Sequence, residues 1–117
     1  MQIKKYDILI VDCNPTRGSE QKGIRPGIVV QNNRFNQSSP TTVICPLSSV
    51  LKKIYPHHMI VKPSAQNGLR KASRADLLQI RTVDRERIIK KIGVLDERYR
   101  DELKAKFFIS FDLDDIL

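Results

Sequence analysis

Short runs of apolar residues recur through the first two thirds of the chain and predict strands. They occupy residues 8–11, 28–30, 43–47, 59–61 and 75–80 and are rich in β-branched side chains. Loops rich in Gly, Pro, Asn and Ser separate them, as is typical of antiparallel strands. Two runs are almost continuously apolar, which favours strands that are buried on both faces or curled into a barrel. The pattern therefore predicts a small curled antiparallel sheet.

The last third of the chain changes to a helical period. Its apolar residues recur at intervals of four and form one stripe, which Phe108 and Phe111 widen near the end; the stripe consists of Leu95, Tyr99, Leu103 and Phe107. Asp96 is expected to cap the N-terminus of this helix, because a carboxylate is favourable at the positive end of the helix dipole. A shorter helical turn is expected to begin within residues 82–84, with Thr82 or Asp84 as its cap. The combined pattern predicts a mainly β fold of the α+β class with a C-terminal helix.

Length and composition indicate one globular domain over residues 1–117. The chain is 40% hydrophobic and 29% charged, and no repeat or linker divides it. No apolar run is long enough to span a membrane, and the N-terminus does not resemble a signal peptide, so we expect a cytoplasmic protein without membrane contact. Cys13 and Cys45 lack the spacing of a zinc site and are expected to be reduced and buried. We expect no metal and no cofactor.

The charge balance favours a polyanionic partner. The net charge is +8, and basic side chains outnumber acidic ones nine to three in residues 1–69 and twelve to seven in residues 70–111. A basic surface gains affinity for phosphates by releasing their counterions. RNA and an acidic protein both fit this balance.

The most informative segment is residues 14–26, a polar loop that lies between two β-branched runs and ends in arginine. Gly18 and Gly23 can take backbone angles closed to other residues, and Pro26 holds Arg25 in an extended conformation. Such a loop on a rigid sheet presents a guanidinium at a fixed place, which suits a phosphate-handling site. The planar fork of Arg25 can bind two phosphate oxygens at once.

The sequence of this loop resembles the signature of a known toxin family. The pattern D-x-x-P-T-x-G-S-E-Q-x-G-x-R-P, from Asp12 to Pro26, resembles the signature of the MazF/PemK/Kid family of toxin endoribonucleases. The resemblance continues at residues 31–32, 39–41, 46–48 and 78–84 and so covers nearly all of the chain. It implies an SH3-like barrel with a long C-terminal helix, as in this family and in the related gyrase poison CcdB.

The resemblance also implies catalytic residues. It assigns Arg25 the central role, as an acid/base and as a stabiliser of phosphate charge. A guanidinium pKa above about 12 makes the charge-stabilising role the better one physically. Ser48 follows the third predicted strand, where the family has a hydroxyl that bonds the scissile phosphate, and its neighbour Ser49 is the alternative. Glu20 is given a functional role, by accepting from a ribose hydroxyl or holding Arg25, although it could also cap amides of its own loop.

Four further side chains are candidates for RNA contacts. Recognition of unpaired RNA uses side-chain donors and acceptors on exposed base edges and phosphates, and the candidates are Arg17, Gln21, Gln79 and Arg81. His57 and His58 are the only two histidines of the chain. A pair of histidines commonly supplies the acid and the base for RNA cleavage. Adjacent strand residues point to opposite faces, so we expect that these two do not flank one phosphate.

The leading hypothesis is a type II toxin that is a sequence-specific, metal-independent and ribosome-independent endoribonuclease. It would cut single-stranded mRNA by attack of the 2′-OH, leaving a 2′,3′-cyclic phosphate and a 5′-OH and so inhibiting translation and growth. The resemblance implies a homodimer and an antitoxin with an acidic, partly disordered segment, which a basic toxin fits.

Two alternatives stay open. One is a non-enzymatic inhibitor of DNA gyrase, as CcdB is on the same fold, although the chain lacks the terminal tryptophan of such poisons and has no tryptophan at all. The other is a basic RNA-binding module without turnover.

Overall fold

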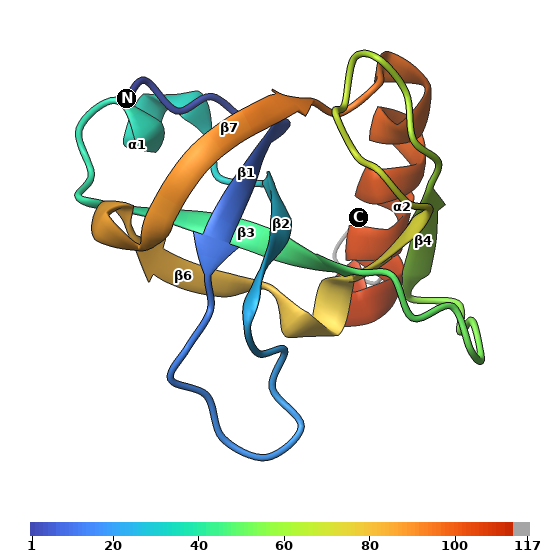
Figure 1. The fold of residues 1–117 in the computed structure, drawn as a ribbon. Coiled ribbons are helices and arrows are strands. Elements are labelled where there is room, and N and C mark those ends of the chain that lie inside the picture. Colours follow the sequence, from blue (N-terminus) through green and yellow to red (C-terminus); the bar gives the residue numbers. More distant parts are fainter. Residues whose placement is uncertain (114–117) are drawn as a thin grey trace.

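The computed structural model describes residues 1–113, which form a curled antiparallel sheet with a helix packed against one end (Figure 1). The strands are β1 (Asp7–Asp12), β2 (Ile24–Val29), β3 (Thr41–Ser48), β4 (His58–Val61), β5 (Ser73–Asp76), β6 (Arg81–Asp84) and β7 (Ile88–Val94). The helices are α1 (Asn33–Asn36) and α2 (Arg100–Phe111), and single 3₁₀ turns are η1 (Leu77–Gln79), η2 (Arg85–Arg87) and η3 (Glu97–Tyr99). This confirms the predicted mainly β fold with a C-terminal helix.

The long strand β3 joins the two parts of the sheet. The strand order is β4-β5-β3-β2-β1-β7, with β6 also paired to β3. The first half of β3 pairs with β6, and its last two residues, Leu47 and Ser48, pair with β5. Because β3 changes partners along its length, the sheet curls around it, and the end of β3 lies where the two parts meet (Figure 1).

The central strands are buried on both faces, as their continuous apolar runs predict. Ile8 and Ile28 belong to a core cluster that also includes Leu103 of α2, whereas their neighbours Leu9 and Val29 belong to a second cluster. Successive side chains of a strand point to opposite faces, so one apolar run supplies both clusters. The sheet is therefore a rigid base for the loops that it carries.

The predicted helical stripe packs on this core, but its cap differs from the prediction. Leu95, Tyr99 and Leu103 are buried, and Phe107 packs against the same cluster, whereas Phe111 is 41% exposed. Asp96 precedes η3 but makes no side-chain capping bond. Its carboxylate accepts instead from the Asn67 side chain at 2.8 Å.

Several expected element boundaries were wrong. The run at residues 75–80 is a strand only to Asp76 and continues as η1. Residues 81–84 form β6 rather than a helical turn; the turn is η2, where Asp84 is the cap as expected. β7 was not predicted, because Lys90 and Lys91 interrupt its apolar pattern. Arg25 lies within β2, opposite Val11, rather than in the loop.

Both cysteines are buried free thiols, and within residues 1–113 no helix has both the length and the hydrophobicity of a membrane span. Burial raises the pKa of the Cys13 thiol, although Arg81 and Arg25 oppose this. Burial likewise raises the pKa of Cys45.

Candidate functional site

The loop between β1 and β2 extends beyond the sheet (Figure 1) and is tied down at both ends. The Gly23 amide donates to the Asn14 side chain at 3.1 Å, and Arg81 donates to the Cys13 carbonyl at 2.8 Å. Gly18 and Gly23 have φ values of +54° and +86°, which favour glycine. These contacts give a polar loop a defined shape.

Arg25 is held by backbone carbonyls rather than by a carboxylate. Its Nε donates to the Lys22 carbonyl at 2.7 Å, Nη2 donates to the same oxygen, and Nη1 donates to the Leu47 carbonyl at 3.2 Å. The side chain is half-buried, and no ion pair within residues 1–113 includes it. The guanidinium is thus fixed in place with its charge uncompensated, as an anion-binding group needs to be.

The bond to Leu47 brings Arg25 to the end of β3, where the two candidate serines lie. Ser48 is 8% exposed, and its Oγ accepts from the Val50 amide at 3.1 Å. That bond orients the hydroxyl and leaves its proton free to be donated. Ser49 is exposed and lines the hollow beside Arg25, whereas Ser48 is not among its lining residues.

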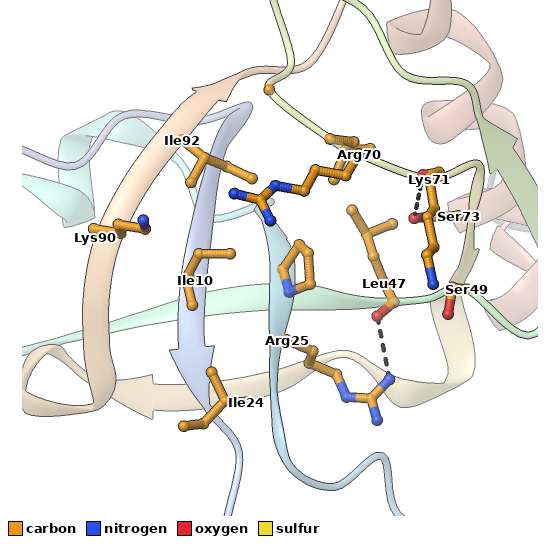
Figure 2. A pocket seen from close by; sticks show the side chains of 13 residues that line it. Ile10, Ile24, Arg25, Leu47, Ser49, Arg70, Lys71, Ser73, Lys90 and Ile92 are labelled. Atoms are coloured by element: carbon orange, nitrogen blue, oxygen red, sulfur yellow. Dashed lines mark hydrogen bonds between the residues drawn. The ribbon is translucent and has the colours of Figure 1, made fainter.

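Arg25 lies on the wall of a basic hollow of about 660 Å³ (Figure 2). The basic hollow is lined by Ile10, Ile24, Arg25, Pro26, Leu47, Ser49, Gly68, Leu69, Arg70, Lys71, Ser73, Lys90 and Ile92. Four of these side chains are cationic and none is acidic, so the hollow concentrates positive potential. Its apolar floor and basic walls suit a nucleotide, which has an apolar face and an anionic phosphate.

Sequence reasoning missed three of these four cations. Arg70 and Lys71 approach from the segment before β5, and Lys90 comes from β7 (Figure 2). The adjacent pair Arg70–Lys71 is a visible charge signal in the sequence, but no spacing connects it with Arg25. Only the curl of the sheet brings the segments together.

Four of the other predicted site residues line a second hollow, of about 530 Å³. Glu20, Gln21, Gln79 and Arg81 all belong to its lining, whereas Arg25 does not. Glu20 Oε1 accepts from the Arg17 amide at 2.5 Å, so Glu20 caps its own loop. Arg17 is exposed and lines neither hollow. The structure thus divides the predicted set between two sides of the loop.

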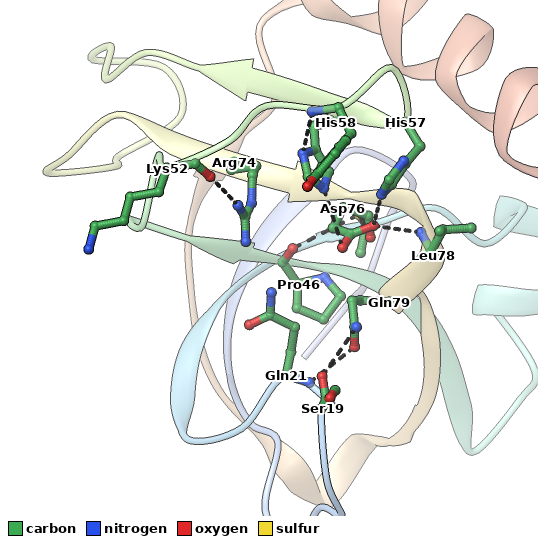
Figure 3. Close-up of polar contacts among 12 residues, drawn as sticks. Ser19, Gln21, Pro46, Lys52, His57, His58, Arg74, Asp76, Leu78 and Gln79 are labelled. Carbon is green, nitrogen blue, oxygen red and sulfur yellow. Dashed lines mark hydrogen bonds and ion pairs between the residues drawn. The ribbon is translucent and has the colours of Figure 1, made fainter.

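Gln79 joins the second hollow to the loop (Figure 3). Its Oε1 accepts from the Gln21 amide at 3.1 Å, and its Nε2 donates to the Ser19 carbonyl at 3.4 Å. One side chain therefore spans the loop tip on both sides of Glu20.

His57 and His58 do not point to opposite faces, as strand alternation would place them. Nε2 of His57 lies 3.4 Å from Asp76 Oδ1, and Nε2 of His58 lies 3.5 Å from Asp76 Oδ2 (Figure 3). β4 begins only at His58, so the alternation of a strand does not apply to His57. Neither histidine lines the two hollows.

The cluster of His57, His58 and Asp76 offers three possible metal ligands within 4.8 Å of one another. However, the Tyr55 amide donates to Nδ1 of His58 at 3.0 Å, so neutral His58 carries its proton on Nε2. Burial lowers the pKa of His58 although Asp76 opposes this, which favours that neutral form. A metal bound at Nε2 would require the proton on Nδ1, facing the Tyr55 N–H. The donor set therefore fits a hydrogen-bonded array better than a metal ion.

Comparison with known proteins decides the family. Residues 4–111 match the model of the PemK-like, MazF-like toxin of type II toxin–antitoxin systems. The chain belongs to this toxin family. It is 34% identical over 116 residues to Endoribonuclease EndoA of Bacillus subtilis strain 168, covering 98% of this chain and 99% of that protein. It is 33% identical over 112 residues to Endoribonuclease MazF of Staphylococcus saprophyticus, covering 95% and 92%.

Solved structures of the same toxin type share the fold. MazF from Deinococcus radiodurans superposes with a TM-score of 0.81 at 20% identity, covering 96% of this chain and 98% of that one. A mycobacterial endoribonuclease in complex with its cognate antitoxin superposes with a TM-score of 0.79 at 15% identity. The match covers 95% of this chain and 96% of that one. The predicted MazF/PemK membership is confirmed, and the gyrase-inhibitor alternative is not favoured.

Proposed function

We propose that this toxin is a metal-independent, ribosome-independent endoribonuclease that cuts single-stranded mRNA at preferred sequences in the cytoplasm and thereby inhibits translation and growth. The observation that carries the proposal is the fixed Arg25 fork in a hollow that, among residues 1–113, is lined by four cations and no carboxylate. The names of the two relatives, both endoribonucleases, support it.

The chemistry asks mainly for charge stabilisation. The ribose 2′-OH gives up its proton to solvent as its oxygen attacks the adjacent phosphorus. The bond from phosphorus to the 5′ oxygen breaks and that oxygen takes up a proton from solvent, which leaves a 2′,3′-cyclic phosphate and a 5′-OH. Arg25 stabilises the extra negative charge on the phosphate, and a hydroxyl at the end of β3, that of Ser48 or of its exposed neighbour Ser49, donates to the same phosphate. Glu20 supports the reaction by shaping the loop, because its Oε1 already accepts from the Arg17 amide.

The two hollows suggest a path for the RNA on either side of the cut bond. Arg70, Lys71 and Lys90 contact phosphates and a base in the basic hollow, where no acid competes for them. Gln21, Gln79 and Arg81 offer base-edge and phosphate contacts in the second hollow, and Arg17 contacts the backbone beyond it.

The proposal includes two protein partners. An acidic antitoxin segment fits the net charge of +8, and one solved relative is a complex with its cognate antitoxin.

A homodimer would cover the apolar side chains of the β3–β4 loop, where Val50, Leu51, Ile54 and Tyr55 are 41–54% exposed. Light scattering that gives the mass of a single chain would contradict the homodimer.

Incubation of purified protein with total RNA in EDTA tests the proposal. We expect discrete fragments with 5′-OH ends and cyclic phosphates, because no step requires a metal. Intact RNA together with gyrase-dependent DNA breaks would support a gyrase inhibitor instead. Tight RNA binding without product, under excess substrate, would support a binding module. Sequencing of the fragment ends also gives the preferred RNA motif.

Ser48 and Ser49 are distinguished by paired substitutions. Ser48→Ala is expected to lower kcat by about 10- to 100-fold, since a hydrogen bond to a charged group contributes about 1.5–3 kcal/mol. Ser49→Ala is the matched control and is expected to stay within about twofold, because an exposed hydroxyl is not preorganised. The opposite order of effects, measured on a short RNA, would transfer the role to Ser49.

A further inference from the structure

Asp76 lies at a junction that the proposed reaction does not use. It is the last residue of β5 and caps η1, with its Oδ1 accepting from the Leu78 amide at 2.9 Å. Its side chain is only 13% exposed, and the Nε2 atoms of His57 and His58 lie on its two carboxylate oxygens. A single carboxylate thus orients the start of η1 while two imidazoles hold it in place (Figure 3).

The histidines form a compact support for this carboxylate. The rings of His57 and His58 are 4.2 Å apart between centroids, and Tyr55 stacks on His57 at 5.9 Å. The Tyr55 amide fixes the His58 tautomer so that Nε2–H faces Asp76. The rotamer of Asp76 is therefore constrained from several sides, as a group that positions other residues needs to be.

A continuous chain of contacts runs from Asp76 to Arg25. Asp76 caps η1, and the last residue of η1 is Gln79, which bonds the Gln21 amide and the Ser19 carbonyl. The residue after Gln21 is Lys22, whose carbonyl accepts from both Nε and Nη2 of Arg25. The placement of η1 therefore affects the carbonyl that holds the guanidinium.

We propose that Asp76 is a positioning residue for Arg25, acting through η1, Gln79 and the tip of the β1–β2 loop, and that His57 and His58 hold its carboxylate in the required orientation. This inference rests on the proposed endoribonuclease function. Catalytic groups must be held to within a fraction of an ångström, and a displacement of about 1 Å can cost about 10²-fold in rate. Asp76 itself does not touch the RNA.

The chain contains a matched control for this role. Asp84 is likewise the last residue of a strand, and it caps η2 by accepting from the Glu86 amide at 2.9 Å. It makes the same capping hydrogen bond as Asp76, although it is exposed and its backbone angles differ. Arg87 of η2 donates to the Asp12 and Asn14 carbonyls at the base of the loop, but within residues 1–113 no hydrogen bond joins η2 to the tip residues 19–21. A purely local loss of the capping bond should therefore have a similar cost in the two Asp→Ala variants.

Hydrogen exchange at the Gln21 amide tests the mechanical part of the inference without using activity. Asp76→Ala is expected to lower the protection of this amide by about tenfold, because η1 no longer holds Gln79 in place. Asp84→Ala is expected to leave it within about twofold of wild type. Unchanged protection in a folded Asp76→Ala variant would overturn the inference.

Kinetics on a short RNA test the catalytic part. Asp76→Ala is expected to lower kcat by about 10- to 100-fold with little change in KM, since Arg70, Lys71 and Lys90 still bind the RNA in the basic hollow. Asp84→Ala is expected to leave both constants unchanged, and Asp76→Asn, which retains a capping oxygen, is expected to recover most of kcat. An equal loss in the Asp76→Ala and Asp84→Ala variants, or a rise in KM alone, would overturn the inference.

Two further outcomes are separable. If Asp76→Ala does not fold, Asp76→Glu keeps the charge beside the histidines while displacing the cap, and the same two measurements apply with the same expectations. If wild-type protein does not cut RNA, the proposed function fails, whereas the exchange of the Gln21 amide still decides whether Asp76 holds the loop.

Discussion

Replacement of Arg25 by alanine is expected to lower kcat for RNA cleavage by about 10²–10³-fold, the usual cost of removing a preorganised donor to a charged transition state. The guanidinium is already held by the carbonyls of Lys22 and Leu47, so little reorganisation is needed when the phosphate gains charge. Its removal takes one of four cations from a hollow without an acid. Cleavage of a short labelled RNA under single-turnover conditions measures the effect.

Two further variants control for charge and for folding. Arg25→Lys keeps the charge but not the planar fork, and it is expected to recover only a small part of the activity. Arg34→Ala removes an arginine from the exposed face of α1 and is expected to keep wild-type activity. Wild-type cleavage by a folded Arg25→Ala protein would refute the assignment of Arg25.

Substitution of Gly93 by alanine is expected to destabilise the fold by about 3 kcal/mol, at the upper end of the usual range for overpacking. A Cβ atom at Gly93 would lie 2.4 Å from the Gln66 carbonyl oxygen and 2.5 Å from the Asn67 carbonyl carbon. Both atoms are backbone, so they cannot rotate away. Asn67 is fully buried, and its side chain bonds the Lys62 carbonyl and Asp96, which keeps residues 64–68 in place. Urea denaturation measures the loss.

Gly27→Ala provides the comparison within the sheet. A Cβ atom at Gly27 would lie 2.9 Å from Cδ1 of Ile44, the flexible end of a side chain that can adjust. Gly27→Ala is therefore expected to lower the free energy of unfolding by about 1 kcal/mol, clearly less than Gly93→Ala. Equal urea midpoints for Gly93→Ala and wild type would show that residues 66–68 can move away from β7. The basic hollow should also change shape in Gly93→Ala, since Gly68 and Ile92 line it.

The missed strands have physical explanations in the surroundings of particular residues. Among the strands of residues 1–113, β7 pairs only with β1, at the edge of the sheet, and edge strands commonly carry lysines that block further pairing. Lys90 and Lys91 therefore look like a break in a strand when only the sequence is read. In β6 only Val83 is buried, so its polar neighbours hide the strand. Whether these two segments form strands depends on their pairing with β3 and β1, which local propensity does not reveal.

The position of the histidines shows the same limit. The alternation rule applies only inside a strand, and nothing local indicates that β4 starts at His58 rather than His57. The pairing of β4 with β5 places Asp76 opposite His58. This cluster therefore follows from strand register, which the sequence pattern alone does not specify.

Local chemistry in the chain was sufficient to predict the class of fold, the doubly buried central strands, the C-terminal helix and the glycine-bounded loop that precedes Arg25. These features depend on side-chain branching, apolar spacing and allowed backbone angles, all of which act between near neighbours. Folding alone decided which cations share a hollow with Arg25 and why Gln79 and Arg81 lie on the other side of the loop. It also decided how Asp76 connects, through Gln79 and the loop tip, to Arg25. Each of these joins segments distant in sequence through strand pairing and the curl of β3, and such long-range contacts depend on the packing of the whole domain.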